Sequence, residues 1–384
     1  MTPAALADLV RSVAHGVLAE HGLDPAALPD TVTVHRPRDP QHGDYATNVA
    51  LQTATKAGVV PRSFAEWLAQ ELAQRPGVRT AEVGGPGLVN LRLGVDAYGE
   101  ILAQVLAAGK NFGASHTLAD RRIKLTAVTP ETAGPLHLSD ARSVAVSDAL
   151  ERILTFAGAA VTEAAVIDEA PDVCIYLLGA DHDGTAGDER ATVELLSGQH
   201  VHLVHPGAGV LSATRPPTMA DLVEAVGVDA AHYALIRWPY ASPIDIDLTV
   251  WSKRTGGNPV FAVQYVHARL ASLARNAADL GISCSGAALQ LLDHHREGEL
   301  IRTLGDFPCT VASAAVLREP HRVARYLERL AATYHDFAGS CRVLPVGDEQ
   351  PGPLHAARSA LCEATRQVLA NGLGLLGVSA PERM

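Results

Sequence analysis

The sequence predicts an α/β protein built from three parts: a small α+β module over residues 1–110, a reduced α/β nucleotide-type domain over 111–255, and an α-helical bundle over 256–384. Between residues 123 and 167, a strand pattern, a Pro/Gly loop, a helix pattern and a second apolar run follow one another, which is the order of a βαβ unit. From about Gly257 onward the strand signals disappear, and apolar residues recur at every third and fourth position. These two observations predict the fold class.

The first part combines helix patterns with two short strand patterns. The N-terminal segment MTPAALADLVRSVAHGVLAEHG is amphipathic and carries early acidic residues. It therefore predicts a helix and not a signal peptide, and we expect a cytoplasmic protein. Residues 31–34 and 88–93 are β-branched or alternating and are bounded by Pro or Gly, which favours strands.

The second part begins at Ile123. The run IKLTAV predicts a strand, and TPETAGPLH predicts a loop of a size that suits a phosphate group. A helix pattern extends from about Asp140 to Phe156. After Gly158 comes a second apolar run, VTEAAVID, which completes the βαβ unit.

The connection after this unit is short. The apolar runs 161–167 and 173–178 are separated only by DEAPD, whereas a parallel crossover needs a dozen or more residues. Pro171 also favours a turn. We therefore expect the two strands to be antiparallel neighbours, to exchange with another chain, or to be displaced from a common parallel sheet.

Three long helical patterns dominate the last part. They cover residues 261–280, 322–343 and 356–377, and each ends at Gly or at a loop that contains Pro. Because no strand pattern interrupts them, a helical bundle is predicted.

Composition and charge narrow the function classes. A formal net charge of -11 opposes contact with phosphate at long range, so a nucleic-acid ligand requires a local concentration of basic residues. The longest apolar stretches are too short to cross a bilayer. Five cysteines show no close pair and no paired C-x-x-C spacing, so the sequence indicates neither a disulfide framework nor a metal site.

Three stretches, at the beginning, middle and end of the chain, resemble one family. The first is QHGDYATNVALQ (41–52) followed by GGPGLVNLRL (84–93), the second is AGPLHLSDAR (133–142), and the third starts at NPVFAVQYVHAR (258–269) and continues to the terminal methionine. Together they resemble the arginyl-tRNA synthetases, a class I aminoacyl-tRNA synthetase family. Three long motifs in the right order are a more specific signal than any single short pattern.

This resemblance implies a more detailed architecture and a ligand. It implies an N-terminal additional domain that contacts the D-loop of tRNA, a reduced class I nucleotide-binding (Rossmann-like) domain, and a C-terminal anticodon-binding bundle. It also implies tRNA of the arginine type as a partner and ATP as the candidate cofactor. The chain would be a truncated and degenerate paralogue, because the signature motifs depart from the family pattern.

The departures concern the groups that would stabilise negative charge on phosphate. In AGPLHLSDAR the first signature histidine is kept as His137, but Ser139 and Asp140 replace the family's glycine and second histidine. His137 is thus a vestigial catalytic residue, and Asp140 is expected to cap the following helix. No lysine occurs between Lys124 and Lys253, where the resemblance implies a mobile KMSK loop. Arg215 is the cation that remains in that loop.

Some residues of a ligand pocket are kept. Glu131 could pair with the guanidinium of arginine, although a solvated loop carboxylate is an equal alternative. The stretch LLGADHDG (177–184) lies at the end of a predicted strand, where α/β sheets bind ligands. The nucleotide-binding residues that the resemblance implies are Gly134, Pro135, Gly179, Asp181 and His182.

Contacts to tRNA are implied at both ends of the chain. Arg318, Arg322, Arg325 and Arg329 recur at three- and four-residue spacing, so they are expected along one side of a helix, with His321 and Arg342 nearby. A solvated face paired with Glu319 and Glu328 is the alternative. The implied tRNA-binding residues are Leu88, Asn90, Gln264, Tyr265, His267, Arg269, Arg318, Arg322 and Arg325.

Three functions remain open from the sequence. The first is a tRNA-binding protein with amino-acid activation lost or crippled, and the second is an active arginine-tRNA ligase that uses ATP. The third is an interaction protein without RNA, for example a partner of a synthetase or of a biosynthetic enzyme. A protein partner or a domain-swapped dimer is also expected as an alternative arrangement of the chain. Under the first, His137→Ala leaves tRNA binding unchanged, and replacing Arg322 and Arg325 together weakens it.

Overall fold

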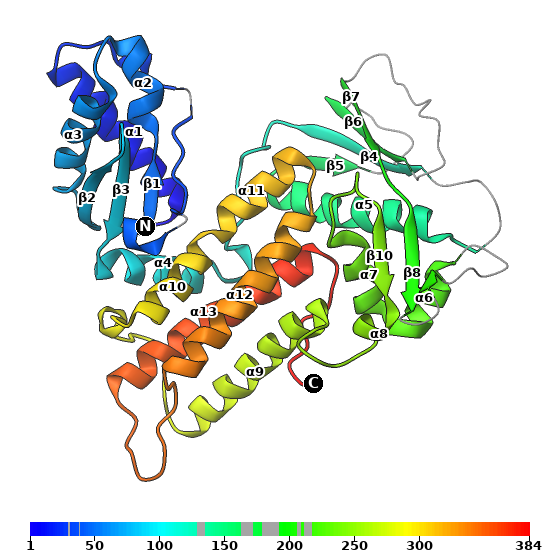
Figure 1. The fold of residues 1–384 in the computed structure, drawn as a ribbon. Helices are drawn as coiled ribbons and strands as arrows, with labels where there is room; N and C mark the ends of the chain where they lie inside the picture. The colour runs from blue at the N-terminus through cyan, green and yellow to red at the C-terminus, as the bar shows by residue number, and fades with distance from the viewer. Residues whose placement is uncertain are drawn as a thin grey trace.

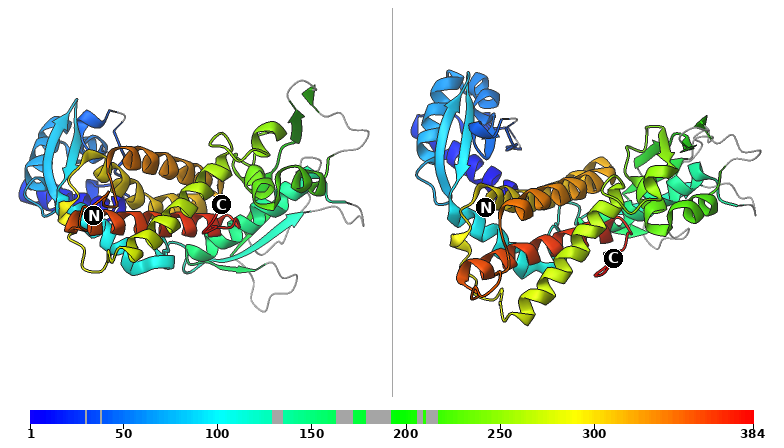
Figure 2. Two further views of the ribbon diagram at one scale, coloured as in Figure 1. Left: turned by 90° about the horizontal axis from the view of Figure 1, so that it is seen from below. Right: turned by 60° about the horizontal axis from the view of Figure 1, so that its bottom comes forward.

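The structure is a computed structural model that describes residues 1–29, 31–37, 39–128, 135–162, 172–178, 192–205, 209–210 and 217–384. Three parts are visible in Figure 1: an N-terminal part in blue, an α/β part in green and a helical bundle in yellow to red. The two views of Figure 2 show the N-terminal part and the α/β part at opposite ends of the bundle. The mixed α/β fold class that the sequence predicted is confirmed.

The N-terminal part packs helices against a small antiparallel sheet. The first helix begins where Pro3 occupies the first helical position and the Thr2 hydroxyl accepts a hydrogen bond from Ala5 N, a common helix start. The sheet has the strand order β1-β3-β2. The elements are α1 (Pro3–Glu20), β1 (Tyr45–Thr47), α2 (Val49–Ala57), α3 (Pro61–Leu72), β2 (Val78–Gly84) and β3 (Leu88–Leu93).

One predicted strand of this part is wrong. Residues 31–34 do not pair in a sheet, and nearby only His35 forms an isolated bridge, with Ala46. Val32 and Val34 instead pack on the hydrophobic core. The β-branched pattern therefore arose from core packing and not from strand pairing.

The N-terminal part is joined to the bundle by α4 (Val95–Ala108), which packs beside α10 (His295–Gly305). Two polar contacts fix this joint: Arg302 Nη1 lies 3.0 Å from Asp44 Oδ1 and donates to the Tyr98 hydroxyl over 2.7 Å. The hydrophobic core of residues 6–97 is separate from the core that runs through the rest of the chain. The N-terminal part is thus a distinct packing unit held by polar contacts and by α4.

The α/β part contains a parallel sheet with the strand order β5-β4-β6-β7. Its strands are β4 (Arg122–Val128), β5 (Ala160–Thr162), β6 (Val173–Leu178) and β7 (Thr192–Ser197), and α5 (Leu138–Phe156) packs on it. Beside it lie a second sheet and three helices, namely β8 (Val201–His205), β9 (Gly209–Val210), β10 (Ile244–Asp247), α6 (Met219–Val226), α7 (Val228–Ile236) and α8 (Leu248–Trp251).

The expectation for the short connection is wrong. Both β5 and β6 are parallel to β4 and lie on its two sides, so they share one parallel sheet without being adjacent. Residues 163–171, which join the two strands, lie outside the described residues. The minimum length of a parallel crossover was therefore not a reliable guide here, because β5 and β6 both pair in parallel with β4.

The rest of the chain is helical, as predicted. All residues from 217 to 384 are described, and no strand occurs in them after β10. The bundle consists of α9 (Pro259–Asp279), α10, α11 (Phe307–Leu317), α12 (His321–Ser340) and α13 (Pro353–Leu375). Its core is continuous with that of the α/β part.

One stretch of the described residues, His295–Leu317, is long and apolar enough to cross a membrane by length and composition. It comprises α10 and α11, which meet at Asp306. Half of the apolar window is buried. Core helices of a bundle have the same composition, so this stretch is explained by packing.

Candidate functional site

Two signature regions lie next to each other at the start of α5. His137 forms a backbone bridge with Thr218, and Leu138 N donates to Pro217 O over 3.2 Å. The His137 side chain is exposed. The segment that precedes α5 thus runs beside the segment that precedes α6, the geometry in which two catalytic loops could face one ligand.

The predicted cap of α5 is wrong. The helix begins at Leu138 and its N-cap is His137, which has extended backbone angles, whereas Asp140 is in the first turn and is 7% exposed. A helix N-terminus attracts anions, but a buried carboxylate in its first turn already supplies negative charge there. An ionised carboxylate at this position opposes binding of an anion at this end of α5.

Several predicted pocket residues lie outside the described residues: Glu131, Gly134, Gly179, Asp181, His182 and Arg215. Of the predicted nucleotide-binding set, only Pro135 is described, and it is exposed. Within the described residues no cluster of His, Cys, Asp and Glu could hold a metal ion.

Behind the signature loop, Arg142 is fully buried and is held by backbone carbonyl groups. Its guanidinium donates to four backbone carbonyls: Ser242 O and Pro239 O at 2.7 Å each, Leu235 O at 3.3 Å and Gln199 O at 3.4 Å. Burial lowers the pKa of Arg142 to about 10, so the group stays charged at neutral pH. It ties α5 to the loop after α7 and to the start of β8.

Tyr240 adds hydrogen bonds that connect α5 and the loop after α7 to the parallel sheet. Its hydroxyl donates to Leu178 O over 2.8 Å and lies 2.6 Å from Ser143 Oγ, and its ring packs against Gly198, where a Cβ would lie 2.8 Å from the ring. Burial raises the pKa of Tyr240, so its proton remains available for this bond. Arg142 and Tyr240 were not predicted as important, because their partners are backbone groups distant in sequence.

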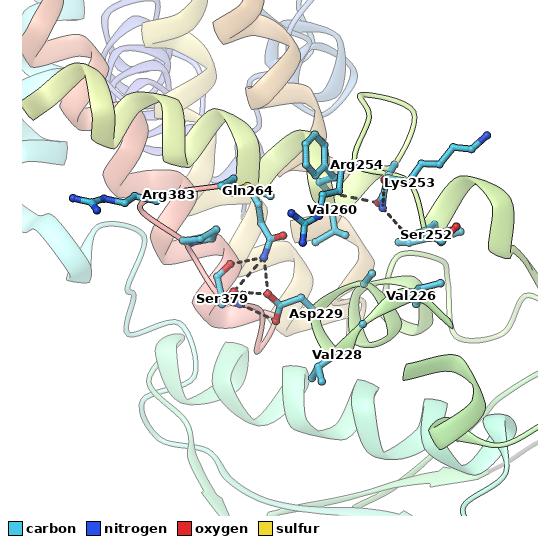
Figure 3. Close-up of a pocket in the computed structure, with 17 residues that line it drawn as sticks. Val226, Val228, Asp229, Ser252, Lys253, Arg254, Val260, Gln264, Ser379 and Arg383 are labelled. Atoms are coloured by element: carbon cyan, nitrogen blue, oxygen red, sulfur yellow. Dashed lines mark hydrogen bonds between the residues drawn. The ribbon is translucent and has the colours of Figure 1, made fainter. Parts of the chain in front are cut away.

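A cavity of about 530 Å³ opens between α8, the start of α9 and the C-terminal tail (Figure 3). Lys253, Arg254 and Arg383 line it, and all three are exposed. Asp229 is also in the lining, but its carboxylate accepts hydrogen bonds from Ser379 N and Ser379 Oγ. The three cations therefore give this cavity a positive rim.

Two of the predicted tRNA contacts on α9 hold the tail in place. Gln264 Nε2 donates to Asp229 Oδ2 over 2.7 Å and to Ser379 O over 3.0 Å (Figure 3). His267 Nδ1 lies 2.9 Å from Pro381 O. Both side chains are buried and their polar groups position the tail, and Gln264 also lines the cavity.

The other two predicted residues of α9 face solvent. Tyr265 is 43% exposed, and its ring stacks on Phe261, which lines the cavity, with centroids 5.9 Å apart. Arg269, one turn later, is also exposed. An aromatic pair beside a cationic cavity can stack an unpaired base while the cations contact its phosphate.

In the N-terminal part, the predicted contacts Leu88 and Asn90 lie on β3 and are half-buried. Asn90 pairs with Ala46 of β1 and Glu82 of β2, so it lies on the central strand of the sheet. These two residues are not near the cavity of Figure 3 in sequence or in fold, and they would contact a different region of a large ligand.

Four arginines were predicted to lie along one face of a helix, and three of them do. Arg318 precedes α12, has a left-handed backbone with φ of 57° at the end of α11, and is paired with Glu194 of β7 at 3.2 Å. Its side chain is only 10% exposed. The geometric prediction for Arg318 is therefore wrong, because α12 starts at His321 and only Arg322, Arg325 and Arg329 share its face.

Two family descriptions match the chain. The family described as "Arginyl tRNA synthetase N terminal domain" matches residues 4–93, and "DALR anticodon binding domain" matches residues 263–384. Among solved structures, the Thermus thermophilus arginyl-tRNA synthetase is similar over 100% of both chains, with 16% identity and a TM-score of 0.72. The Plasmodium falciparum arginyl-tRNA synthetase is similar over 100% of both chains, with 10% identity and a TM-score of 0.74. The two structures support the predicted fold.

Proposed function

Because this chain belongs to the arginyl-tRNA synthetase family and carries an anticodon-binding domain, we propose that it binds tRNA of the arginine type and has lost most or all amino-acid activation. The observation that supports tRNA binding best is the exposed ring of Tyr265, which stacks on half-buried Phe261 beside the cationic cavity of the anticodon-binding domain. Stacking and phosphate contact are the two interactions that single-stranded RNA needs.

The buried pair Gln264 and His267 supports the same function indirectly. By bonding to Ser379 and Pro381 they fix the tail that carries Arg383 at the cavity. A fixed cation costs less conformational entropy on binding than a flexible one. The anticodon side of the molecule is thus preorganised for a polyanion.

Among the residues that the structure describes, the activation side shows no comparable set of cations. In activation a carboxylate attacks the α-phosphorus of ATP and pyrophosphate leaves, and rate comes from cations placed on the developing charge. When bound, ATP would supply the adenylyl group, and His137 is a signature-loop residue among those described that could contact its phosphates. Asp140 repels them, and the chain has no lysine from 125 to 252. An active arginine-tRNA ligase remains the second candidate because the solved relatives are synthetases.

A pair of single variants tests the proposed anticodon surface. Tyr265→Ala should weaken binding of an arginine tRNA transcript by about 10-fold, because loss of one stacked base costs about 1–3 kcal/mol. His137→Ala should leave the affinity unchanged, since this exposed side chain lies on the activation side. Filter binding with both purified variants measures the two affinities.

Thermal melting provides the control, and both exposed substitutions should leave the melting temperature close to that of the parent. Equal tRNA affinities for Tyr265→Ala and the parent would refute the proposed anticodon surface. A fall in tRNA affinity with His137→Ala would instead indicate that the signature loop contacts RNA.

A further inference from the structure

A groove lies between the N-terminal part and the bundle, away from the cavity of Figure 3. It has a volume of about 590 Å³ and is lined on one side by Arg36 and Tyr45 of the N-terminal part. On the other side it is lined by α11 and α12. We call it the interdomain groove; the residues that matter below are Arg36, Tyr45, Asp306, Arg322, Arg325 and Arg329.

One buried carboxylate serves two arginines at the floor of this groove. Arg36 Nη2 lies 3.0 Å from Asp306 Oδ2, and Arg329 Nη2 lies 3.4 Å from the same oxygen. Because Asp306 carries one charge at most, the two guanidiniums are not fully neutralised. The floor is cationic even with Asp306 ionised.

The wall formed by α12 adds further positive charge. Arg322 is paired with Glu319, and Arg325 lies 3.4 Å from Glu328. Arg237 makes shorter contacts to Glu328, of 2.7 and 3.0 Å, so this carboxylate is shared between Arg237 and Arg325. Arg325 is therefore only partly compensated.

Each of these arginines has exposed side-chain surface, although the Nε and Nη2 atoms of Arg36 are buried and form no hydrogen bond. The side chains of Arg322, Arg325 and Arg329 are 43%, 40% and 52% exposed, and Arg36 is 30% exposed. They follow the first turns of α12, where Arg325 also stacks at 4.3 Å on Trp238 of the α/β part. We call the row formed by Arg36, Arg322, Arg325 and Arg329 the positive strip. It runs from the N-terminal part toward the α/β part.

The positive strip is opposite in sign to the net charge of the molecule. The chain carries a formal net charge of -11, whereas the strip contains four arginines and only one carboxylate in its lining. Guanidinium groups bind phosphate oxygens in pairs, which suits them to a phosphodiester backbone. Its two walls belong to the two segments that match synthetase domain descriptions, residues 4–93 and 263–384.

We propose that the interdomain groove is a second phosphate site, in which Arg36 of the N-terminal part and the arginines of α12 together hold the backbone of the tRNA bound at the anticodon surface. This inference rests on the proposed function. It adds Arg36 and Asp306, which no sequence motif indicated, and it makes binding depend on both parts of the chain at once. An acidic protein segment is the competing occupant.

Two substitutions of opposite sign test the groove. Arg36→Gln should weaken binding of full-length arginine tRNA several-fold and lower the salt slope by about one unit, because one phosphate contact is lost. Asp306→Asn should tighten binding and raise the slope, because it removes the carboxylate that competes with phosphate. Burial raises the pKa of Asp306, so a neutral side chain is readily accommodated at this position.

Matched controls distinguish the loss of a phosphate contact from a disturbance of the folded structure. Arg62→Gln, an exposed arginine of the same N-terminal part with its own partner Glu66, should change neither affinity nor slope. Arg36→Lys should restore part of the lost affinity. An isolated anticodon stem–loop should bind the parent and Arg36→Gln equally if the groove holds a part of the tRNA outside the anticodon arm.

The outcomes are distinguishable. If the parent binds tRNA but Asp306→Asn and Arg36→Gln both weaken it, the groove is a structural joint and the inference is wrong, while the proposed function stands. If both variants bind tRNA as the parent does, the groove takes no phosphate and the inference is wrong. If only the binding of polyglutamate changes, the occupant of the groove is an acidic protein segment. If the parent binds no tRNA at all, both proposals are wrong.

Discussion

ATP–pyrophosphate exchange that depends on arginine is expected to stay at background when this protein is assayed, with or without tRNA. The expectation follows from charge: Asp140 occupies the first turn of α5, and no lysine lies between Lys124 and Lys253. Each missing preorganised donor costs about 10²–10³-fold in rate. Loss of both a histidine and the loop lysine would therefore lower exchange by several orders of magnitude relative to an intact synthetase.

A matched variant guards this assay against contamination by a host synthetase. His137→Ala should leave any residual exchange unchanged if that signal comes from the host. Exchange that requires arginine and disappears with His137→Ala would show that the chain is an active ligase, which contradicts the proposed loss of activation. The same result would make the signature loop catalytic and not vestigial.

Replacing Arg142 with alanine should lower the free energy of unfolding by about 3–5 kcal/mol, a large value for one substitution. The guanidinium is 0% exposed and donates to four carbonyls, which would be left buried without donors. Each such group costs about 1–3 kcal/mol, although entry of water reduces the sum. Urea unfolding followed by circular dichroism measures the change.

Arg152→Ala provides the control on the same helix. Arg152 is 41% exposed and pairs with Asp148 one turn away, so its loss should cost about 0.5 kcal/mol or less. A change for Arg142→Ala as small as that for Arg152→Ala would mean that the buried guanidinium does not hold α5 to the loop after α7. Arg142→Lys should be intermediate, because an ammonium cannot span all four carbonyls.

Periodicity predicted the helical bundle because its helices are long and amphipathic. The patterns at 261–280, 322–343 and 356–377 correspond to α9, α12 and α13. It did not indicate α10, whose buried residues include Glu297, held by Arg358 at 2.7 Å. A buried charge disrupts an apolar pattern, and only its partner, distant in sequence, explains it.

The strands were harder to predict. The error over the β5–β6 connection arose because β4 was not considered: β5 and β6 both pair in parallel with β4, one on each side, so they share a sheet without being adjacent. The expected strand at 31–34 failed because Val32 and Val34 pack on the core without pairing. Short apolar runs do not distinguish pairing from packing.

In the candidate site, too, the sequence pattern predicted the helices better than the surroundings of single side chains. The spacing of Arg322, Arg325 and Arg329 predicted a shared helix face, whereas Arg318 lies outside that helix. Motif resemblance indicated α9, but burial there decides the roles: Gln264 is buried and Tyr265 is exposed. The contribution of Arg36 could not be predicted, because its partner Asp306 is distant in sequence.

The most direct test of the account is the affinity of the unmodified protein for an arginine tRNA transcript, measured by filter binding at two salt concentrations. The four phosphate contacts of the interdomain groove alone predict that affinity falls by at least about 10²-fold between about 50 and 200 mM salt, and contacts at the cavity of Figure 3 add to this fall. Clear binding with that dependence is the expected result. No binding at the lower salt concentration, together with capture of a protein partner, would contradict the account and favour an interaction protein.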